Sequence, residues 1–161
     1  MTVRLRPLRP DEYPAFVDVS RREYADDLRQ NGGLTREAAE AKAERDFAEL
    51  LPDGLATPGH TITAIELQPG GTRIGRLWFA RRELNGRTAA YLYDITIDEA
   101  HRGAGLGRAA MAAYERAARE QGFERLELNV FGGNQRARGL YRSLGFTETA
   151  VNMAKQLTPD S

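Results

Sequence analysis

Apolar and polar residues alternate along six stretches of the chain, with the period of a β-strand. We predict strands over residues 3–8, 60–67, 73–82, 87–97, 126–130 and 146–157. Pro69-Gly70-Gly71 joins the second of these to the third, and Asn85-Gly86 joins the third to the fourth. Short glycine-bearing turns are typical of β-hairpins, so these three strands are predicted to be antiparallel.

Four other stretches carry apolar residues at helical spacing, which predicts helices over residues 11–30, 35–51, 105–121 and 134–144. Thr35 and Asn134 stand at the N-cap positions of two of these helices. The helix at 105–121 connects the strands at 87–97 and 126–130, which are therefore expected to be parallel. The resulting order βααβββαβαβ predicts an α/β fold, a mixed and mostly antiparallel sheet flanked by helices.

Composition narrows the classes of partner and chemistry. With 161 residues and no Pro/Gly/Ser-rich linker, the chain is predicted to form a single domain over residues 1–161. Its 23 basic and 23 acidic side chains cancel, so no overall field favours nucleic acid or an anionic membrane. The absence of cysteine excludes disulfides, thiolate metal sites and a cysteine nucleophile. The N-terminus has no apolar run typical of a signal peptide or membrane span, and we expect a cytoplasmic protein.

Three glycines separate the predicted strand at 87–97 from the helix that follows it. Gly103, Gly105 and Gly107 let the backbone fold closely because they carry no Cβ atom. The first N–H groups of a helix have no intrahelical partner and lie at the positive end of its dipole, so this turn suits a phosphate group. Arg102 and Arg108 add positive charge. The glycine spacing fits neither the dinucleotide fingerprint nor the Walker motif.

The spacing Arg102-x-x-Gly105-x-Gly107 after a hydrophobic strand resembles the acyl-CoA pyrophosphate loop of the GNAT superfamily of N-acyltransferases. A second match lies downstream, where the family has the pattern N-x-x-A-x-x-L-Y-x-x-x-G-F. The matching residues are Asn134, Ala137, Leu140, Tyr141, Gly145 and Phe146. With the strand and helix between the two motifs, the resemblance covers residues 88–146. The chain departs from the family pattern at Gly139, where a larger residue is common.

The resemblance implies an acetyl-CoA-dependent N-acetyltransferase in which an amine attacks the thioester directly, without a covalent enzyme intermediate and without a metal. Two histidines in different predicted elements agree with the expectation of no metal site. The strands at 87–97 and 126–130 would splay apart, and pantetheine would lie in the gap as an added strand. The residues implied for acetyl-CoA binding are Ile95, Thr96, Ile97, Arg102, Gly103, Ala104, Gly105, Leu106, Gly107, Arg108, Asn134, Ala137 and Tyr141.

Tyr141 and Asp94 are the residues that we expect to take part in catalysis. By the resemblance, the Tyr141 phenol protonates the departing CoA thiolate, whereas an aromatic residue on an amphipathic helix is otherwise a core residue. Strand alternation places Asp94 on the same side as Leu92 and Thr96. Asp94 either receives the acceptor's proton, directly or through water, or forms a structural bond to a neighbouring strand. The residues expected to line the acceptor pocket are Glu23, Tyr24 and Trp78.

Two further classes of function stay open. The chain is an alternative candidate for a non-catalytic acyl-CoA-binding or regulatory module with the same fold. A structural interaction protein, in which the glycine loop is only a turn and Asn134 only an N-cap, is the third possibility. Acetyl-CoA and an amine acceptor are the expected partners, in a monomer or a homodimer, and the acceptor pocket varies within the family.

Overall fold

The computed structural model describes residues 2–84 and 86–159, and within them the strands form one sheet in the order β1-β2-β3-β4-β5. The strands are β1 (Thr2–Pro7), β2 (His60–Gln68), β3 (Thr72–Leu84), β4 (Arg87–Ile97) and β5 (Leu126–Leu128). Neighbours from β1 to β4 pair antiparallel, and β4 pairs with β5 in parallel, which confirms the predicted directions. Asn85 of the second predicted turn lies outside the described residues.

The helices are α1 (Tyr13–Gln30), α2 (Arg36–Leu50), α3 (Leu106–Glu120) and α4 (Gln135–Ser143). A short 3-10 helix, Pro10–Glu12, precedes α1, so the predicted first helix covers both. The predicted N-caps are confirmed, since the side chains of Thr35 and Asn134 accept hydrogen bonds from the amides of Ala38 and Ala137, each at 3.2 Å. Each bond satisfies one amide in the first turn of its helix.

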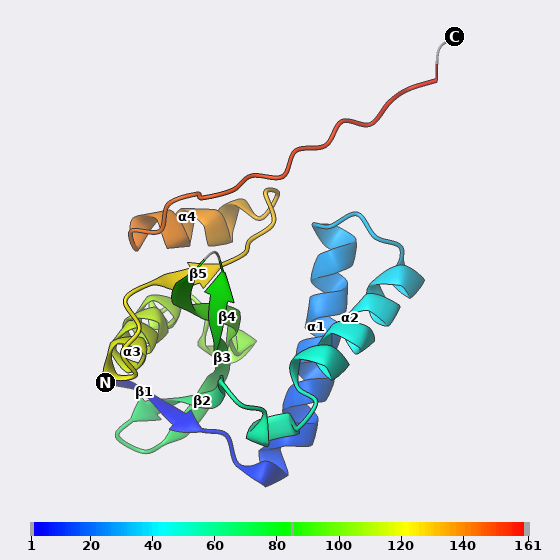
Figure 1. The fold of residues 1–161 in the computed structure, drawn as a ribbon. Coiled ribbons are helices and arrows are strands. Elements are labelled where there is room, and N and C mark those ends of the chain that lie inside the picture. Colours follow the sequence, from blue (N-terminus) through cyan, green and yellow to red (C-terminus); the bar gives the residue numbers. More distant parts are fainter. Residues whose placement is uncertain (1, 85, 160–161) are drawn as a thin grey trace.

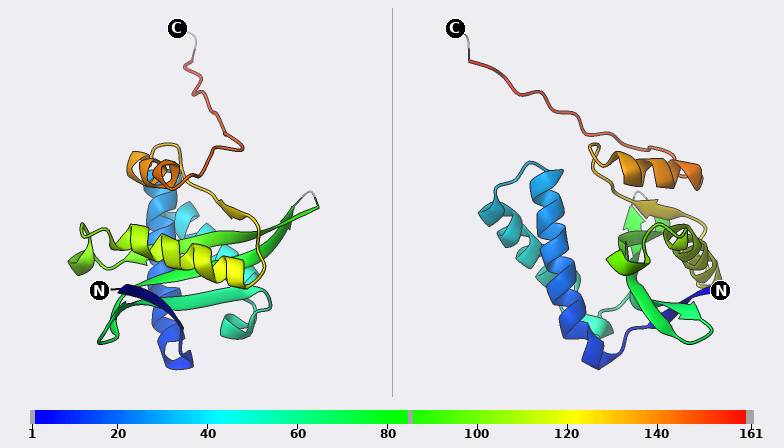
Figure 2. Two further views of the ribbon diagram at one scale, coloured as in Figure 1. Left: turned by 90° about the vertical axis from the view of Figure 1, so that its left-hand side faces the viewer. Right: turned by 180° about the vertical axis from the view of Figure 1, so that it is seen from behind.

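The helices cover both faces of the sheet: α1 and α2 lie on one side and α3 on the other (Figures 1 and 2). On the α3 side, Leu77 and Phe79 of β3 are buried with Tyr114 of α3. On the opposite side, Trp78 packs with Phe16 of α1 and Phe47 of α2. Consecutive residues of β3 therefore serve two different cores, as the period of a strand requires.

A β-bulge interrupts the pairing of β3 with β4. Trp78 lies opposite Asp94 and Phe79 opposite Leu92, which leaves Tyr93 as an extra residue in β4. Leu92 packs into the core beside α3, whereas Tyr93 stacks on Trp78 and Asp94 bonds to α1 on the opposite side. The prediction that Asp94 shares a side with Leu92 is thus wrong, because simple alternation does not hold across a bulge.

The prediction of a strand over residues 146–157 is also wrong. Phe146 still packs against the α3-side core, but residues 147–159 pair with no strand of the described chain and are exposed. Figures 1 and 2 show this segment running past α4 and away from the body. The described order is accordingly βααβββαβα. An alternating pattern indicates strand potential, but a strand forms only where a second edge can complete its hydrogen bonds.

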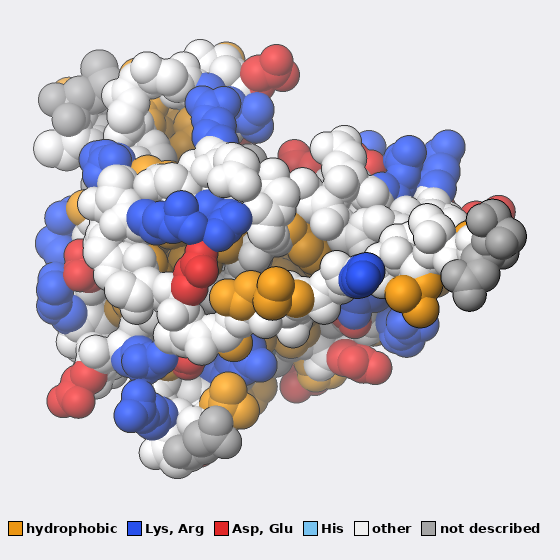
Figure 3. All heavy atoms as spheres, turned by 90° about the horizontal axis from the view of Figure 1, so that it is seen from above, with side chains coloured by type: hydrophobic (Ala, Val, Ile, Leu, Met, Phe, Trp, Pro, Cys, Tyr) orange, Lys and Arg blue, Asp and Glu red, His pale blue; other side chains and the backbone are white. Residues whose placement is uncertain are grey.

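None of the helices within residues 2–84 and 86–159 has the combination of length and apolarity needed to cross a bilayer. On the face that contains α4, basic and acidic side chains are interspersed among uncharged ones (Figure 3).

Candidate active site

The edge of β4 is open along its second half. The β4–β5 ladder contains the pairs from Ala90–Leu126 to Leu92–Leu128, and β4 then continues to Ile97. Among the described residues, the part of β4 after Leu92 pairs only with β3. Ile95 and Ile97 pack toward the core and the Thr96 hydroxyl bonds to Asp94, so these side chains are engaged within the protein. What this edge offers to a ligand is its backbone N–H and C=O groups.

The glycine loop leads from the end of β4 into α3. Gly103 has φ +86° and Gly105, the N-cap of α3, has φ +74°, a left-handed conformation that residues with a Cβ rarely adopt. Gly107 lies in the first turn of α3, and a Cβ added there would meet no atom within 4 Å. The start of α3 therefore presents unpaired amides to open space, which is the geometry of an anion site.

The two arginines beside the loop are held differently. Arg102 donates from Nε to the carbonyl oxygen of Ile97 at 2.8 Å and lines a cavity. Arg108 donates from Nη2 to the hydroxyl of Ser143 at 2.7 Å and so links α3 to α4. Of the remaining loop residues, Ala104 is exposed and Leu106 packs against the α3-side core.

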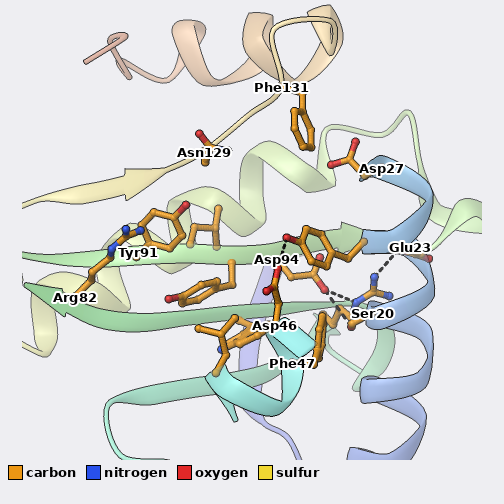
Figure 4. Close-up of a pocket in the computed structure, with 16 residues that line it drawn as sticks. Ser20, Glu23, Asp27, Asp46, Phe47, Arg82, Tyr91, Asp94, Asn129 and Phe131 are labelled. Atoms are coloured by element: carbon orange, nitrogen blue, oxygen red, sulfur yellow. Dashed lines mark hydrogen bonds and ion pairs between the residues drawn. The ribbon is translucent and has the colours of Figure 1, made fainter. Parts of the chain in front are cut away.

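A cavity of about 740 Å³ lies between α1, α2, β3, β4 and the segment that follows β5. Figure 4 shows Asn129 and Phe131 across the cavity from Tyr91 and Asp94 of β4, with Asp27 at one side. Its walls contain all three residues predicted to line an acceptor pocket, Glu23, Tyr24 and Trp78. Rings form much of this wall: Tyr93 stacks on Trp78 with ring centroids 4.7 Å apart.

Arg76 of β3 is a component of the cavity that sequence reasoning missed. It is only 6% exposed, and its guanidinium bonds to Asp94 at 2.7 Å and to Glu23 of α1. Burial lowers the pKa of Arg76, but the negative charges and hydrogen bonds of Asp94 and Glu23 outweigh it, and the net direction is upward. An arginine inside the buried stretch Ile74–Ala80 of β3, whose other residues are apolar or glycine, was the available signal, because a buried charge needs a partner.

Asp94 has both carboxylate oxygens occupied. Oδ2 accepts hydrogen bonds from Arg76 and from the hydroxyl of Ser20 at 3.2 Å, and Oδ1 accepts one from the hydroxyl of Thr96 at 2.9 Å. The Asp94 carboxylate has three donors, one of which is its ion-pair partner Arg76, and these bonds connect α1, β3 and β4. This arrangement favours the structural alternative for Asp94 over that of a free proton acceptor.

Tyr141 lies on α4, packed edge-to-face against Phe146 with ring centroids 5.7 Å apart. Burial raises the pKa of Tyr141, and the negative charge of Asp94 raises it further. The fold therefore brings the two residues expected to be catalytic within electrostatic reach of each other. Tyr141 is not among the residues that line the 740 Å³ cavity.

A second cavity, of about 710 Å³, lies between the end of α1 and the start of α4. Arg102 and Asn134 line it, which brings together one residue from each of the two sequence motifs. Glu23 and Asp27 line both cavities, so the two hollows adjoin each other along α1. Ala137 follows Asn134 on the first turn of α4, where its amide receives the N-cap bond.

Comparison with known proteins agrees with this geometry. The model of the acetyltransferase (GNAT) family matches residues 16–146. YycN of Bacillus subtilis (strain 168), an uncharacterized N-acetyltransferase, is 35% identical over 157 residues, which cover 98% of this chain and 100% of YycN. YdgE of the same organism, described in the same way, is 32% identical over 157 residues, or 98% of this chain and 99% of YdgE.

The crystal structure of YycN has the same fold, with a TM-score of 0.91 at 34% identity over 98% of this chain and 100% of that chain. An acetyltransferase structure from Pyrococcus furiosus gives a TM-score of 0.70 at 23% identity, over 97% of this chain and 99% of that one, and shares the fold. Sequence motifs, sheet topology and these relatives lead to one assignment. The chain belongs to the GNAT family of acetyltransferases.

Proposed function

We propose that this protein is an N-acetyltransferase that uses acetyl-CoA as donor and transfers the acetyl group to an amine by direct attack on the thioester. One observation carries the proposal: the open edge of β4 after Leu92 runs into the glycine turn at the start of α3, beside a cavity large enough for a small acceptor. A backbone edge suits the amides of pantetheine, and the helix start suits a diphosphate.

The donor half of the site rests on backbone groups. The residues that would hold acetyl-CoA are Ile95 to Ile97 through their N–H and C=O groups, and Gly103 to Arg108 through amides at the start of α3. Arg102 and Asn134 would contact the same ligand, which is supported by their common position in the lining of the second cavity. Preformed amides also stabilise negative charge that develops on a thioester carbonyl oxygen.

The acceptor half of the site suits a positively charged amine. The cavity wall contains the acids Glu23, Asp27, Asp46 and Asp94 and the bases Arg76 and Arg82, so acids outnumber bases. Aromatic rings in the same wall provide faces for a cation or an apolar stem. An alkyl amine must lose a proton before it attacks, which costs about 4 kcal/mol near neutral pH. Some group or water chain in this cavity has to accept that proton.

Glu23 is better placed than Asp94 to receive the proton. Its Oε2 bonds to Arg76, but its side chain is 50% exposed and lines both cavities, whereas both oxygens of Asp94 have donors within the protein. Asp94 would instead hold Arg76 and, through the charge of its carboxylate, keep the Tyr141 phenol protonated. In this scheme the Tyr141 phenol donates a proton to the departing thiolate.

The proposal is tested by mixing purified protein and acetyl-CoA with a panel of amines and following the release of free thiol. Amine-dependent release is expected, with cationic amines preferred over neutral ones. Tight acetyl-CoA binding with no release for any amine would instead identify a non-catalytic binding module. Failure to bind acetyl-CoA at all would identify a structural protein.

A further inference from the structure

Most of the charged residues that line the 740 Å³ cavity are paired within the protein. Six charged residues line this cavity. Arg76 forms ion pairs with Asp94 and Glu23. Asp46 forms an ion pair with Lys42 of α2 at 3.0 Å. Four of the six lining charges therefore have a partner of opposite sign before any ligand binds.

The other two charged lining residues are Arg82 and Asp27, and neither has an ion-pair partner within residues 2–84 and 86–159. Arg82 of β3 is exposed, and its guanidinium carbon lies 4.5 Å from the ring centroid of Tyr91. Asp27 of α1 accepts a hydrogen bond from the side-chain amide of Asn31 at 2.6 Å. Figure 4 shows Arg82 at one end of the cavity and Asp27 toward the other. The cavity therefore offers a ligand one positive end and one negative end.

A row of aromatic rings lines the wall between these ends. Tyr91 and Tyr93 of β4 have ring centroids 4.8 Å apart. Trp78 stacks on Tyr93 at 4.7 Å and contacts the ring of Phe47, from α2, at 5.4 Å. Burial raises the pKa of Tyr93, and the positive charge of Arg82 partly offsets this, so that charge acts along the row. Ring faces in such a row suit an apolar stem.

The distance between the two ends follows from the strand that carries the rings. Arg82 lies over Tyr91, which is three residues before Asp94 in β4. Glu23, which we propose to receive the amine's proton, is connected to Asp94 through Arg76. Three residues of a strand span about 10 Å. An extended peptide of three residues has about the same length from its amino group to its carboxylate.

We propose that the acceptor is a dipolar molecule, with its amine at the end of Glu23 and Asp27 and a carboxylate about 10 Å away that binds Arg82. An apolar stem between the two charges lies on the aromatic row. This inference rests on the proposed function, because it names the acceptor of that site. A guanidinium donates paired hydrogen bonds to a carboxylate, whereas a second amine at this end would meet a like charge. Short peptides and amino carboxylates of this length have the required chemistry.

The carboxylate takes no part in the transfer itself. The amine nitrogen bonds to the acetyl carbon as the thioester C–S bond breaks, the amine loses one proton to the cavity, and CoA leaves as the thiol. Arg82 is accordingly a residue that determines specificity, and its effect should appear in the choice among acceptors.

The test compares acceptors that differ only in the charge of the far end. Alanine peptides and ω-amino alkanoates of increasing length are each supplied as the free acid and as the terminal amide, and kcat/KM is measured from thiol release with acetyl-CoA. The wild-type protein is expected to prefer the free acid by ~5-fold or more, with the largest preference at a separation of about 10 Å. Equal rates within every acetylated pair, or acetylation of simple monoamines but of no free acid, would overturn the proposal.

Variants of two neighbouring arginines assign the preference to one side chain. Arg82→Gln should bring the ratio of free acid to amide to about 1, and Arg82→Glu should make the amide the better acceptor. Arg81→Gln is the matched control, because Arg81 does not line the cavity and lies 5.9 Å from the ring centroid of Phe123 on the α3 side. It should keep the wild-type ratio.

Circular dichroism checks that each variant is folded. An Arg82→Gln protein with the wild-type ratio would overturn the proposal even if the wild type prefers free acids. These results differ from a failure of the proposed function, in which no amine of any kind releases thiol and both proposals are rejected.

Discussion

Gly107 gives the sharpest residue-level test of the phosphate loop. Unlike Gly103 and Gly105 it lacks a positive φ, and a side chain there would meet no protein atom within 4 Å. Gly107→Val should therefore fold normally yet block the approach of a diphosphate to the backbone, lowering acetyl-CoA affinity by at least ~10-fold. Arg108→Ala, which removes the bond to Ser143 but leaves the amides in place, should weaken binding far less.

Calorimetric titration of both variants measures this difference, with circular dichroism as the control for folding. A folded Gly107→Val protein that binds acetyl-CoA as tightly as the wild type would remove the phosphate-loop assignment. Gly105→Val is less informative, because its left-handed conformation at φ +74° makes a loss of folding and a loss of binding hard to separate.

Tyr141→Phe isolates the phenol hydroxyl. The ring should still pack on Phe146, so acetyl-CoA affinity should hardly change while kcat falls about 10²-fold, or ~2.7 kcal/mol in the barrier. Burial and the charge of Asp94 raise the pKa of Tyr141 above its ordinary value of 10.0, so the phenol stays protonated at neutral pH. Any alkaline decline that it governs should begin above that value and be absent in the variant.

Single-turnover rates with an identified acceptor are the measurement for Tyr141, since slow product release would hide the chemical step. Rates equal to those of the wild type in a folded Phe variant would return Tyr141 to a packing role.

Asp94→Asn tests whether this carboxylate accepts a proton or holds Arg76. The substitution keeps the shape but removes the ion pair with a buried guanidinium, so we expect a lower melting temperature and a lower rate at every pH. Glu23→Gln, in contrast, should lose activity near neutral pH and recover part of it at higher pH, where more amine is already neutral. Rate profiles against pH for both variants show which of the two carboxylates accepts the proton. High-pH recovery in Asp94→Asn instead would identify Asp94 as the base.

Some of these residues could be predicted from local sequence and others could not. Gly103 and Gly105 follow from the turn between a strand and a helix, which is a local feature. Thr96 is a local partner of Asp94, but its other two partners come from different elements, Arg76 from β3 and Ser20 from α1. Nothing in the sequence near Asp94 specifies them, because they depend on how helix α1 lies over the sheet.

At the scale of elements, a cluster of ion pairs connects β1, the turn before α1, β2 and β3. Arg6 bonds to Glu12 at 2.9 Å and to Glu66, and Arg73 bonds to Glu12 at 3.1 Å. The hydrogen bond from Arg6 is the main cause that lowers the pKa of Glu12 from 4.5 to about 2. Glu12 therefore stabilises the folded state above pH 4.5, and this contribution is lost as the pH falls from 4.5 to about 2.

Glu12→Gln should accordingly have a lower free energy of unfolding than the wild type at neutral pH. On acidification its free energy of unfolding should fall less than that of the wild type. Urea unfolding of both proteins at neutral pH and near pH ~2.5 gives the four free energies that this comparison needs. Asp11→Asn is a suitable control, since Asp11 is exposed and its only ion pair within residues 2–84 and 86–159 is a 3.5 Å contact with Arg9. Equal pH dependence in wild type and Glu12→Gln would show that the cluster does not stabilise the fold.

Element boundaries were predicted closely where local patterns determine them, and less well where they depend on neighbouring elements. β4 has the predicted ends, Arg87 and Ile97, because a turn and a glycine loop bound it. The bulge at Tyr93 has no local signal, since one extra residue becomes visible only in the register with β3. The missing strand after Phe146 has the same origin: its alternation is a local feature, but no strand of the described chain pairs with it.

At the scale of the whole molecule, the order of elements up to α4 and the family were predictable, because the two motifs fix the order of strand, loop and helices. The 740 Å³ cavity was only partly predictable. Glu23, Tyr24 and Trp78 line it, but they come from α1 and β3, and its aromatic wall also includes Tyr91 and Tyr93 of β4. If this cavity holds the acceptor, as we propose, the choice of acceptor depends on a composite surface that no single stretch of sequence encodes.

In the function we propose, the protein moves an acetyl group from acetyl-CoA directly to an amine. The most direct measurement uses acetyl-CoA labelled in its acetyl carbons, with mass spectrometry of the acceptor and of the protein alongside the release of thiol. We predict one labelled acetyl group on the amine for each thiol released, and no acetyl group retained on the protein. Thiol release without labelled amine, or a labelled protein that later passes the group on, would contradict direct transfer.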